Sequence, residues 1–178
     1  MKQLGVLEQF AAQHDLLYQR DGAADRYVNS RDLEYRYAFA RCWSDEGSLI
    51  LWVGVNPAKG DTEKRRRPTL ERCITWSKSW GASGLIFGNL FAARHNKPSG
   101  LRAALDPVGP LNDAMMRRLG AIADRTVVAW GNLELTSRST EVVGLLVNPL
   151  CFGLTGKGQP RHPLYVPHAT ALEPWIPH

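Results

Sequence analysis

The chain has 178 residues, of which 44% are hydrophobic and 22% charged, and its formal net charge at pH 7 is +5. This composition is typical of a globular protein, and no apolar run approaches the roughly 18–20 residues of a membrane span. The start, MKQLGVLEQFAAQHDLLYQRD, lacks the apolar segment and cleavage site of a signal peptide, so we expect a cytoplasmic protein with no membrane partner.

The first predicted elements are a helix and two strands. Apolar residues recur on one side of a helix over residues 3–18, and LEYRYAFARCW (33–43) alternates in the manner of a strand. The turn-forming sequence SDEG at 44–47 predicts a hairpin between that strand and a second strand at 48–55. Residues 1–45 would then add a helix and a strand to the domain that follows.

The remainder of the chain alternates helices with apolar strands. We predict helices over residues 68–80, 111–123 and 137–147, strands over 84–91, 125–131 and 150–154, and a long loop over 92–110. Continuous apolar strands are typical of parallel strands covered on both faces. The prediction is one α/β domain over residues 1–178, a three-layer α/β/α sandwich with a short, mainly parallel four-stranded sheet plus an N-terminal β-hairpin strand.

Polar residues follow several of these strands. Asn56-Pro57 ends one strand, Asn89 lies near the end of the next, and His162 comes after the last. Ligands of parallel sheets bind beyond the carboxyl ends of the strands, so we expect these residues at one edge. An asparagine amide can bind the edge of a nucleobase, and a histidine can donate a hydrogen bond to a developing anion. Each residue alone would be read as an ordinary turn or loop residue.

Positive charge recurs after the same strand ends. Basic residues gather at 64–67, at 94–97 and at 157–162. This pattern permits nucleic-acid binding, although solvated surface charge is the favoured interpretation of any one cluster alone. Three widely spaced cysteines without a CxxC pair favour reduced thiols, so we predict neither a metal nor a cofactor. A monomer is expected.

Four segments resemble the motifs of the uracil-DNA glycosylase superfamily, in family order. VGVNPAKGD resembles the first motif in its mismatch-specific form, and GLIFGNLFAARHNKP resembles the strand that carries the base-reading asparagine. VVAWGN is similar to the next apolar strand, and RHPLYVP to the closing His-Pro motif. The chain also resembles a bacterial family of uncharacterised domains that carry NPA, NLFA and PRHPLY motifs.

The resemblance implies a DNA glycosylase that hydrolyses the N-glycosidic bond of a flipped-out base. Asn89 would bind the base, Asn56 would hold the attacking water, and His162 would stabilise the departing base. The substrate pocket would include Pro57, Ala58 and Phe91. Leu164 and Tyr165 would wedge into the duplex, and basic side chains would hold phosphates: Lys64, Arg65, Arg66, Arg67, Arg94 and Arg161.

Two departures from the family pattern matter. Position 56 carries no carboxylate to activate water, and Asp61 is the nearest acid in the sequence. Ala58 stands where uracil-specific enzymes place a tyrosine that blocks 5-substituted pyrimidines. We therefore hypothesise a modified or bulky pyrimidine as the substrate, in DNA that is double- or single-stranded. Excision of hypermodified bases from phage DNA would give such an enzyme a role in antiviral defence.

Three alternatives stay open at this point. A hydrolase or transferase of free nucleosides or nucleotides would use the same polar edge. A non-catalytic module that binds a base or nucleotide would need no carboxylate at position 56. An α/β domain of unrelated function is the third.

Overall fold

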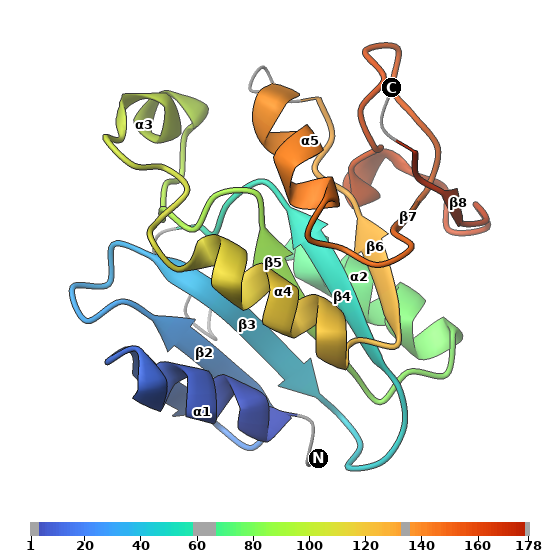
Figure 1. Cartoon of the computed structure of the whole chain (residues 1–178). Helices are drawn as coiled ribbons and strands as arrows, with labels where there is room; N and C mark the ends of the chain where they lie inside the picture. The colour runs from blue at the N-terminus through green and yellow to red at the C-terminus, as the bar shows by residue number, and fades with distance from the viewer. Residues whose placement is uncertain (1–3, 59–66, 133–135, 177–178) are drawn as a thin grey trace.

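The computed structural model describes residues 4–58, 67–132 and 136–176, and within them the chain forms one mixed sheet of eight strands. The strands lie side by side in the order β1-β2-β3-β5-β4-β6-β7-β8 (Figure 1). Their bounds are β1 (Leu17–Asp21), β2 (Asp25–Asn29), β3 (Arg36–Cys42), β4 (Leu49–Gly54), β5 (Gly84–Asn89), β6 (Arg125–Val128), β7 (Leu150–Cys151) and β8 (Glu173–Pro174).

The predicted short, mainly parallel four-stranded sheet is wrong. The four predicted strands do lie together as a parallel block, β5-β4-β6-β7. However, β1, β2 and β3 extend this block as antiparallel neighbours, and β8 pairs antiparallel with β7. Antiparallel pairings therefore outnumber parallel ones among the described strands. The periodicity of the first helix concealed β1, and the polar composition of β2, DRYVN, concealed the second strand.

The predicted hairpin between the two strands that flank residues 44–47 is also wrong. β3 pairs antiparallel with β5, with Phe39 opposite Phe87, and β4 lies on the far side of β5. The reason is burial. Five of the six residues of β4 are buried, and an apolar strand of this kind is stabilised by neighbours along both edges. The interior place between β5 and β6 supplies both.

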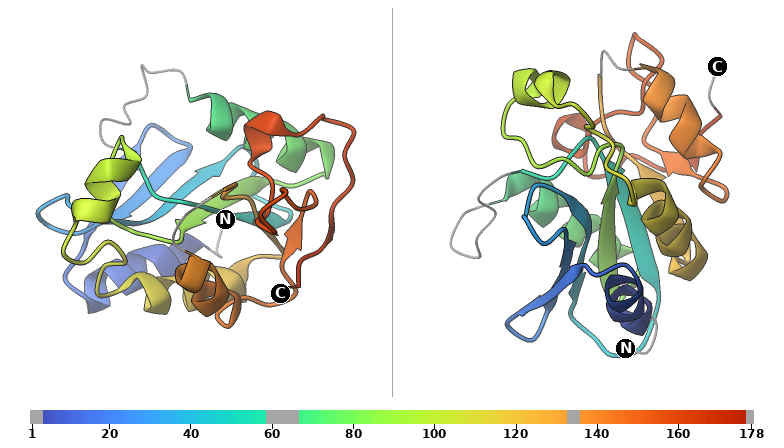
Figure 2. Two further views of the ribbon diagram at one scale, coloured as in Figure 1. Left: turned by 90° about the horizontal axis from the view of Figure 1, so that it is seen from above. Right: turned by 60° about the vertical axis from the view of Figure 1, so that its left-hand side comes forward.

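Helices lie on both faces of the sheet (Figures 1 and 2). α1 and α4 pack on one face, and α2 packs on the other. Their bounds, with the remaining helices, are α1 (Gly5–Gln13), α2 (Pro68–Ser79), α3 (Pro98–Ala103), α4 (Asn112–Ile122), α5 (Thr136–Val143) and the 3₁₀ turn η2 (Pro163–Tyr165). No helix within the described part of the chain is long and apolar enough to cross a membrane.

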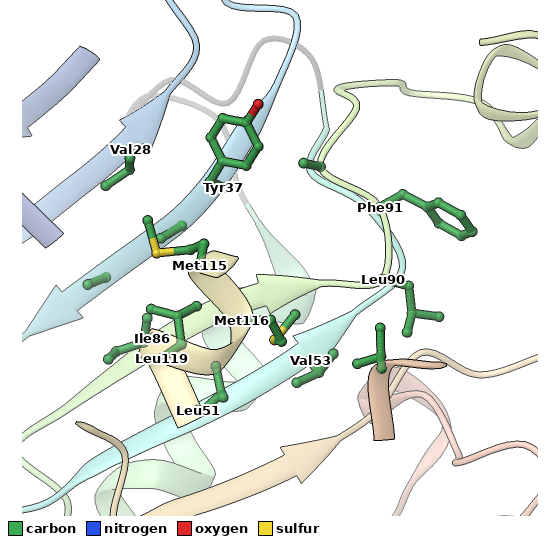
Figure 3. Packing of buried hydrophobic residues seen from close by; sticks show 14 of the residues in the cluster. Val28, Tyr37, Leu51, Val53, Ile86, Leu90, Phe91, Met115, Met116 and Leu119 are labelled. Carbon is green, nitrogen blue, oxygen red and sulfur yellow. The ribbon is translucent and has the colours of Figure 1, made fainter. Parts of the chain in front are cut away.

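Each face of the sheet has its own apolar cluster. Figure 3 shows part of the first, in which Met115, Met116 and Leu119 of α4 pack over Leu51 and Ile86 of the sheet. The second lies under α2 and is rich in rings: Trp52, Trp76, Phe39, Phe87 and Phe152.

Cys42, Cys73 and Cys151 are free thiols, and burial raises the pKa of each. The expectation of reduced cysteines is confirmed within this structure.

Candidate functional site

A cavity of about 570 Å³ lies beyond the carboxyl ends of β4 and β5, on the side of the sheet that α2 covers. Pockets of 300–1,000 Å³ suit drug-sized ligands. Three residues predicted from the sequence, Asn56, Asn89 and His162, line this single cavity. Its full lining is Arg36, Phe39, Gly54, Val55, Asn56, Pro57, Ala58, Arg67, Pro68, Thr69, Leu70, Phe87, Asn89, His95, Asn96 and His162.

The side chain of Asn56 is held in place by hydrogen bonds from its amide nitrogen to backbone carbonyls. Its Nδ2 donates to the carbonyl oxygens of His95 at 2.8 Å and Pro57 at 3.1 Å, with a longer contact to that of Ala93 at 3.4 Å. In return, the backbone N–H of His95 donates to the Pro57 carbonyl at 3.2 Å. These bonds clamp the segment after β5 to the tip of β4. Because the amide nitrogen is committed to carbonyls, the Oδ1 acceptor is the group that Asn56 can offer to a ligand.

Asn89 lies directly beside Gly54 in the parallel pairing of β4 and β5. A Cβ at Gly54 would lie 3.0 Å from the Asn89 Oδ1, which is tighter than ordinary contact. Glycine at position 54 therefore leaves room for the Asn89 amide. The Asn89 backbone is held separately, because Nδ2 of Asn112 on α4 donates to its carbonyl at 3.0 Å. Among the described residues, none makes a hydrogen bond to the Asn89 side-chain amide. Because Asn89 lines the cavity, its two donors and its acceptor can bind a ligand there.

His162 is held as a neutral imidazole. Its Nδ1 accepts a hydrogen bond from the backbone N–H of Leu164 at 3.3 Å, which assigns the proton of the neutral ring to Nε2. Burial lowers the pKa of His162 below its ordinary value, because desolvation disfavours the charged ring. The residue is therefore a hydrogen-bond donor through Nε2 at neutral pH.

The backbone around His162 is anchored from two sides. Arg72 of α2 donates to the Pro163 carbonyl at 3.3 Å and also to that of Val166. On the other side Gly131, at φ +74°, donates its N–H to the Pro160 carbonyl at 2.8 Å, and a Cβ there would lie 3.0 Å from the Cβ of His162. These contacts set the position of the imidazole against β6.

A row of aromatic rings runs across β2, β3 and β5, and two of its members, Phe39 and Phe87, line the cavity. Tyr27 and Phe39 are cross-strand partners with ring centroids 5.1 Å apart, and Phe39 and Phe87 are partners at 6.4 Å. The register skips Tyr37, since Val28 pairs with Ala38 while Asn29 pairs with Arg36. This β-bulge puts Arg36 on the same side as Phe39, where both line the cavity.

Two arginines stand beside this row. The Arg36 guanidinium lies 5.1 Å from the Tyr27 ring, and its Nε donates to Oδ1 of Asn29 at 3.3 Å. The Arg67 guanidinium lies 5.3 Å from the Phe39 ring and 3.6 Å from the buried carboxylate of Asp25. Arg41 binds both oxygens of the same carboxylate, at 2.6 and 2.5 Å.

His95 is the second imidazole of the cavity. Its ring lies against the backbone of α3, because a Cβ at Gly100 would approach its Nδ1 to 2.7 Å. Among the described lining residues there is no aspartate or glutamate. No group of three or more His, Cys, Asp or Glu side chains suitable for a metal occurs in the described ranges.

The other predicted residues are distributed as follows. Pro57 and Ala58 line the cavity, whereas Phe91 belongs to the opposite apolar cluster (Figure 3). Leu164 and Tyr165 are exposed just after His162, with 42% and 82% of their surfaces accessible. Arg94 donates to the Leu33 carbonyl, and the exposed Arg161 donates to the Leu154 carbonyl. Asp61, Lys64, Arg65 and Arg66 lie outside the described residues.

Sequence reasoning missed the residues that face the cavity from within strands. Phe39 and Arg36 lie within the predicted alternating strand at 33–43, and Phe87 within the predicted apolar strand at 84–91, where neither pattern indicates a ligand site. The available signal was a charged residue inside an apolar strand, YRYAF, since buried arginines are rare unless they serve a partner or a ligand. His95 was counted only within a basic cluster.

A family model described as "Protein of unknown function (DUF1643)" matches residues 36–164, which is more than half of the chain. The matched range includes every described residue that lines the cavity. The expectation of a family of uncharacterised domains is thereby confirmed, and the match carries no link to the uracil-DNA glycosylases. No curated protein and no solved structure matches the chain.

Proposed function

Because the chain belongs to the DUF1643 family of proteins of unknown function, we propose from the chemistry of the cavity that it is a DNA glycosylase acting on a modified pyrimidine. The observation that carries the proposal is the shared cavity of Asn56, Asn89 and His162, which lie on three separate segments of the chain. The resemblance to uracil-DNA glycosylases assigns complementary roles to the same three residues.

Asn89 binds the Watson–Crick edge of the flipped base. An amide offers one acceptor and two donors, which matches the alternating groups on that edge of a pyrimidine. His162 acts on the departing base. As the C1′–N bond breaks, negative charge develops on the base, and the Nε2–H of a neutral imidazole donates a hydrogen bond to it. A preorganised donor of this kind is typically worth about 3–4 kcal/mol in the transition state.

Water replaces the base at C1′. Oδ1 of Asn56 accepts a hydrogen bond from this water and so orients its lone pair. The attack forms the C1′–O bond and releases one proton. Among the described lining residues His95 is the group suited to accept it, because no carboxylate lines the cavity and His162 is already committed as a donor.

DNA contacts come from the exposed surface beside His162. Leu164 and Tyr165 are apolar groups of the size that other proteins insert between base pairs when they extrude a nucleotide. Arg161 is exposed next to them and binds a phosphate, which makes binding weaker at high salt. The remaining predicted phosphate contacts, Lys64, Arg65 and Arg66, are tested with it by salt dependence.

The size and openness of the cavity support a modified base as the substrate. A cavity of about 570 Å³ suits a ligand of drug size, which a pyrimidine ring without substituents does not reach. Ala58 contributes a small, exposed side chain to its lining, so among the described residues no ring blocks that part. Excision of such bases from invading phage DNA is the biological use we propose.

The first test is a panel of duplex and single-stranded oligonucleotides that carry uracil, a thymine mismatch or 5-substituted cytosines. Base release is measured as alkali-labile strand cleavage. We expect release from a 5-substituted base. Release of uracil alone would exclude the modified-base substrate, tight binding without product would indicate a binding module, and hydrolysis of mononucleotides alone would indicate a nucleotide hydrolase.

The second test uses single variants on whichever duplex is cleaved. Asn56→Ala and His162→Ala should each lower the single-turnover rate by about 100- to 1,000-fold. His14→Ala is the matched control, because it removes an exposed imidazole that directly follows α1 and does not line the cavity. Full activity in both cavity variants, with the fold intact by circular dichroism, would refute these roles.

A further inference from the structure

The glycosidic chemistry uses only part of the cavity. Four further lining residues, Arg36, Phe39, Arg67 and Phe87, together form what we call the arginine–aromatic subsite. Phe87 and Asn89 are two residues apart on β5, so they point to the same side of the sheet. Two residues of strand span about 7 Å, which places the Phe87 ring within reach of a short substituent on a base held by Asn89.

The floor of the subsite is a ring surface. Phe39 is buried apart from its cavity side, and Phe87 is half-buried at the cavity although its neighbour Ile86 is fully buried. A flat apolar surface of this kind packs against an unsaturated or planar arm of a ligand. The β-bulge at Tyr37 adds a guanidinium to this floor by bringing Arg36 onto the same side.

Positive charge converges on the subsite from three sources. Arg36 is 6% exposed and Arg67 has a side chain that is 15% exposed, so both guanidinium groups are largely removed from water. The third source is the N-terminus of α2, whose first residues Pro68 and Thr69 line the same cavity and which has no side-chain cap. The helix dipole there favours negative charge.

Asp25 orients Arg67, and its carboxylate is bound more closely by Arg41 than by Arg67. Arg41 makes the two short bonds to Asp25, and Arg67 stands at 3.6 Å. A guanidinium has five donors, more than the contacts of Arg67 with Asp25 and with the Tyr27 side chain occupy. Arg67 is therefore oriented by the protein and keeps donors for a ligand in the cavity.

We propose that the arginine–aromatic subsite binds the anionic end of a substituent carried at C5 of the flipped pyrimidine. This inference rests on the proposed glycosylase function and names its substrate class, a base with a terminal carboxylate or phosphate on a short arm. The backbone phosphates of DNA stay outside on the duplex, while Arg36 lies in the interior. The anion that reaches it must therefore enter with the base.

The experiment compares two nearly isosteric bases. Duplexes carry 5-(2-carboxyvinyl)uracil, its neutral amide 5-(2-carbamoylvinyl)uracil, or uracil, and single-turnover release is measured for each. The corresponding free nucleosides and deoxyuridine monophosphate are tested for binding by calorimetry. We expect the acid to be released, and its nucleoside bound, about ten- to a hundredfold better than the amide, since hydrogen bonds to charged groups are worth more than neutral ones.

Variants assign the preference to the subsite. Arg67→Gln should abolish the preference for the acid, so that the acid and the amide are released at similar rates. Arg31→Gln, which removes an arginine from a surface ion pair with Asp15, is the control and should keep the preference. Arg36→Gln is a second variant, and its fold is checked by thermal melting because Arg36 is buried.

The outcomes separate the two proposals. Equal release and equal binding of acid and amide would overturn the subsite, even if bases are excised. An acid preference in nucleoside binding, lost in Arg67→Gln, would support the subsite even if no duplex released a base, and that result would refute the glycosylase alone. Arg67-dependent binding of deoxyuridine monophosphate, with no preference between the two nucleosides, would assign the anion to a nucleotide's own phosphate and overturn the proposal.

Discussion

The two faces of the sheet are built from different chemistry. On the α4 face, Met115, Met116 and Leu119 pack over Leu51 and Ile86, and the cluster around them is apolar throughout (Figure 3). On the α2 face, Trp52 and Trp76 pack with other rings, and a buried carboxylate, Asp25, lies among arginines. The first face is closed by helices, whereas the second opens into the cavity at one end.

The difference between the two faces indicates that the α4 face mainly stabilises the fold, whereas the α2 face presents groups to a ligand. Dense aliphatic packing needs no polar groups and supplies the burial that a core requires. Rings and arginines on the α2 face leave a surface that water reaches, and they present donors to a ligand. Changes on the α4 face should therefore alter the free energy of unfolding, and changes in the cavity should alter function at smaller cost to the fold.

The largest expected effect is an exception on the α2 face. Asp25→Asn removes the carboxylate that Arg41 binds through two bonds and that Arg67 approaches at 3.6 Å. Breaking a buried ion pair from one side costs about 3–5 kcal/mol. Urea unfolding should show a loss of about 4 kcal/mol. Asp15→Asn, in an exposed pair with Arg31, should change the free energy of unfolding by less than about 1 kcal/mol. Equal effects in both variants would contradict the buried pair's role.

A neighbouring pair on β5 tests the comparison directly. Ile86 faces the α4 cluster and is fully buried, whereas Phe87 faces the cavity and is half-buried. Ile86→Ala should lower the free energy of unfolding by about 3 kcal/mol, because core truncation of this kind costs about 2–5 kcal/mol. Phe87→Ala should cost less than half of that and impair ligand binding. Urea unfolding of both variants measures the difference. A larger loss of unfolding free energy for Phe87→Ala than for Ile86→Ala would contradict the assignment of stability to the α4 face and of ligand binding to the α2 face.

Much of the parallel block was predictable because burial on both faces leaves a continuous apolar run in the sequence. β4, β5, β6 and β7 were each expected within a few residues of their bounds. The partner of β3 was not predictable, since the turn sequence at 44–47 is a local signal and strand order is a long-range outcome. β1 was hidden because Leu16, Leu17 and Tyr18 continue the helical spacing past Gln13, where the helix ends.

The cavity residues at or after strand ends were predictable from the sequence, whereas those within the strands were not. Asn56, Asn89 and His162 stand out because all three follow or end apolar strands, although each alone would be read as an ordinary turn or loop residue. Phe39 and Phe87 look like core residues in the sequence, and only their register across β3 and β5 brings them to the cavity. The bulge that turns Arg36 inward depends on pairing with β2, a strand that the sequence did not reveal.

A smaller effect on function should follow from Gly54→Ala. The added Cβ would lie 3.0 Å from Oδ1 of Asn89, so the Asn89 amide, which we propose binds the base, must shift. We expect about a tenfold lower single-turnover rate with little change in the free energy of unfolding. Gly156→Ala is the matched control, because a Cβ there meets nothing within 4 Å. A rate equal to that of the control would show that Asn89 does not set the position of the base.

The smallest expected effect is the pH dependence that His162 contributes to stability. Its folded-state pKa is lowered by burial, so between that pKa and the ordinary value of about 6.5 the unfolded chain binds more protons. The free energy of unfolding therefore decreases as pH falls below about 6.5, and His162→Gln should remove this part of the decrease. Urea unfolding of both proteins at about pH 5 and about pH 8 measures the difference. If both lost the same stability on acidification, His162 would not be desolvated in the folded chain, and its role as a neutral Nε2–H donor would lose its physical basis.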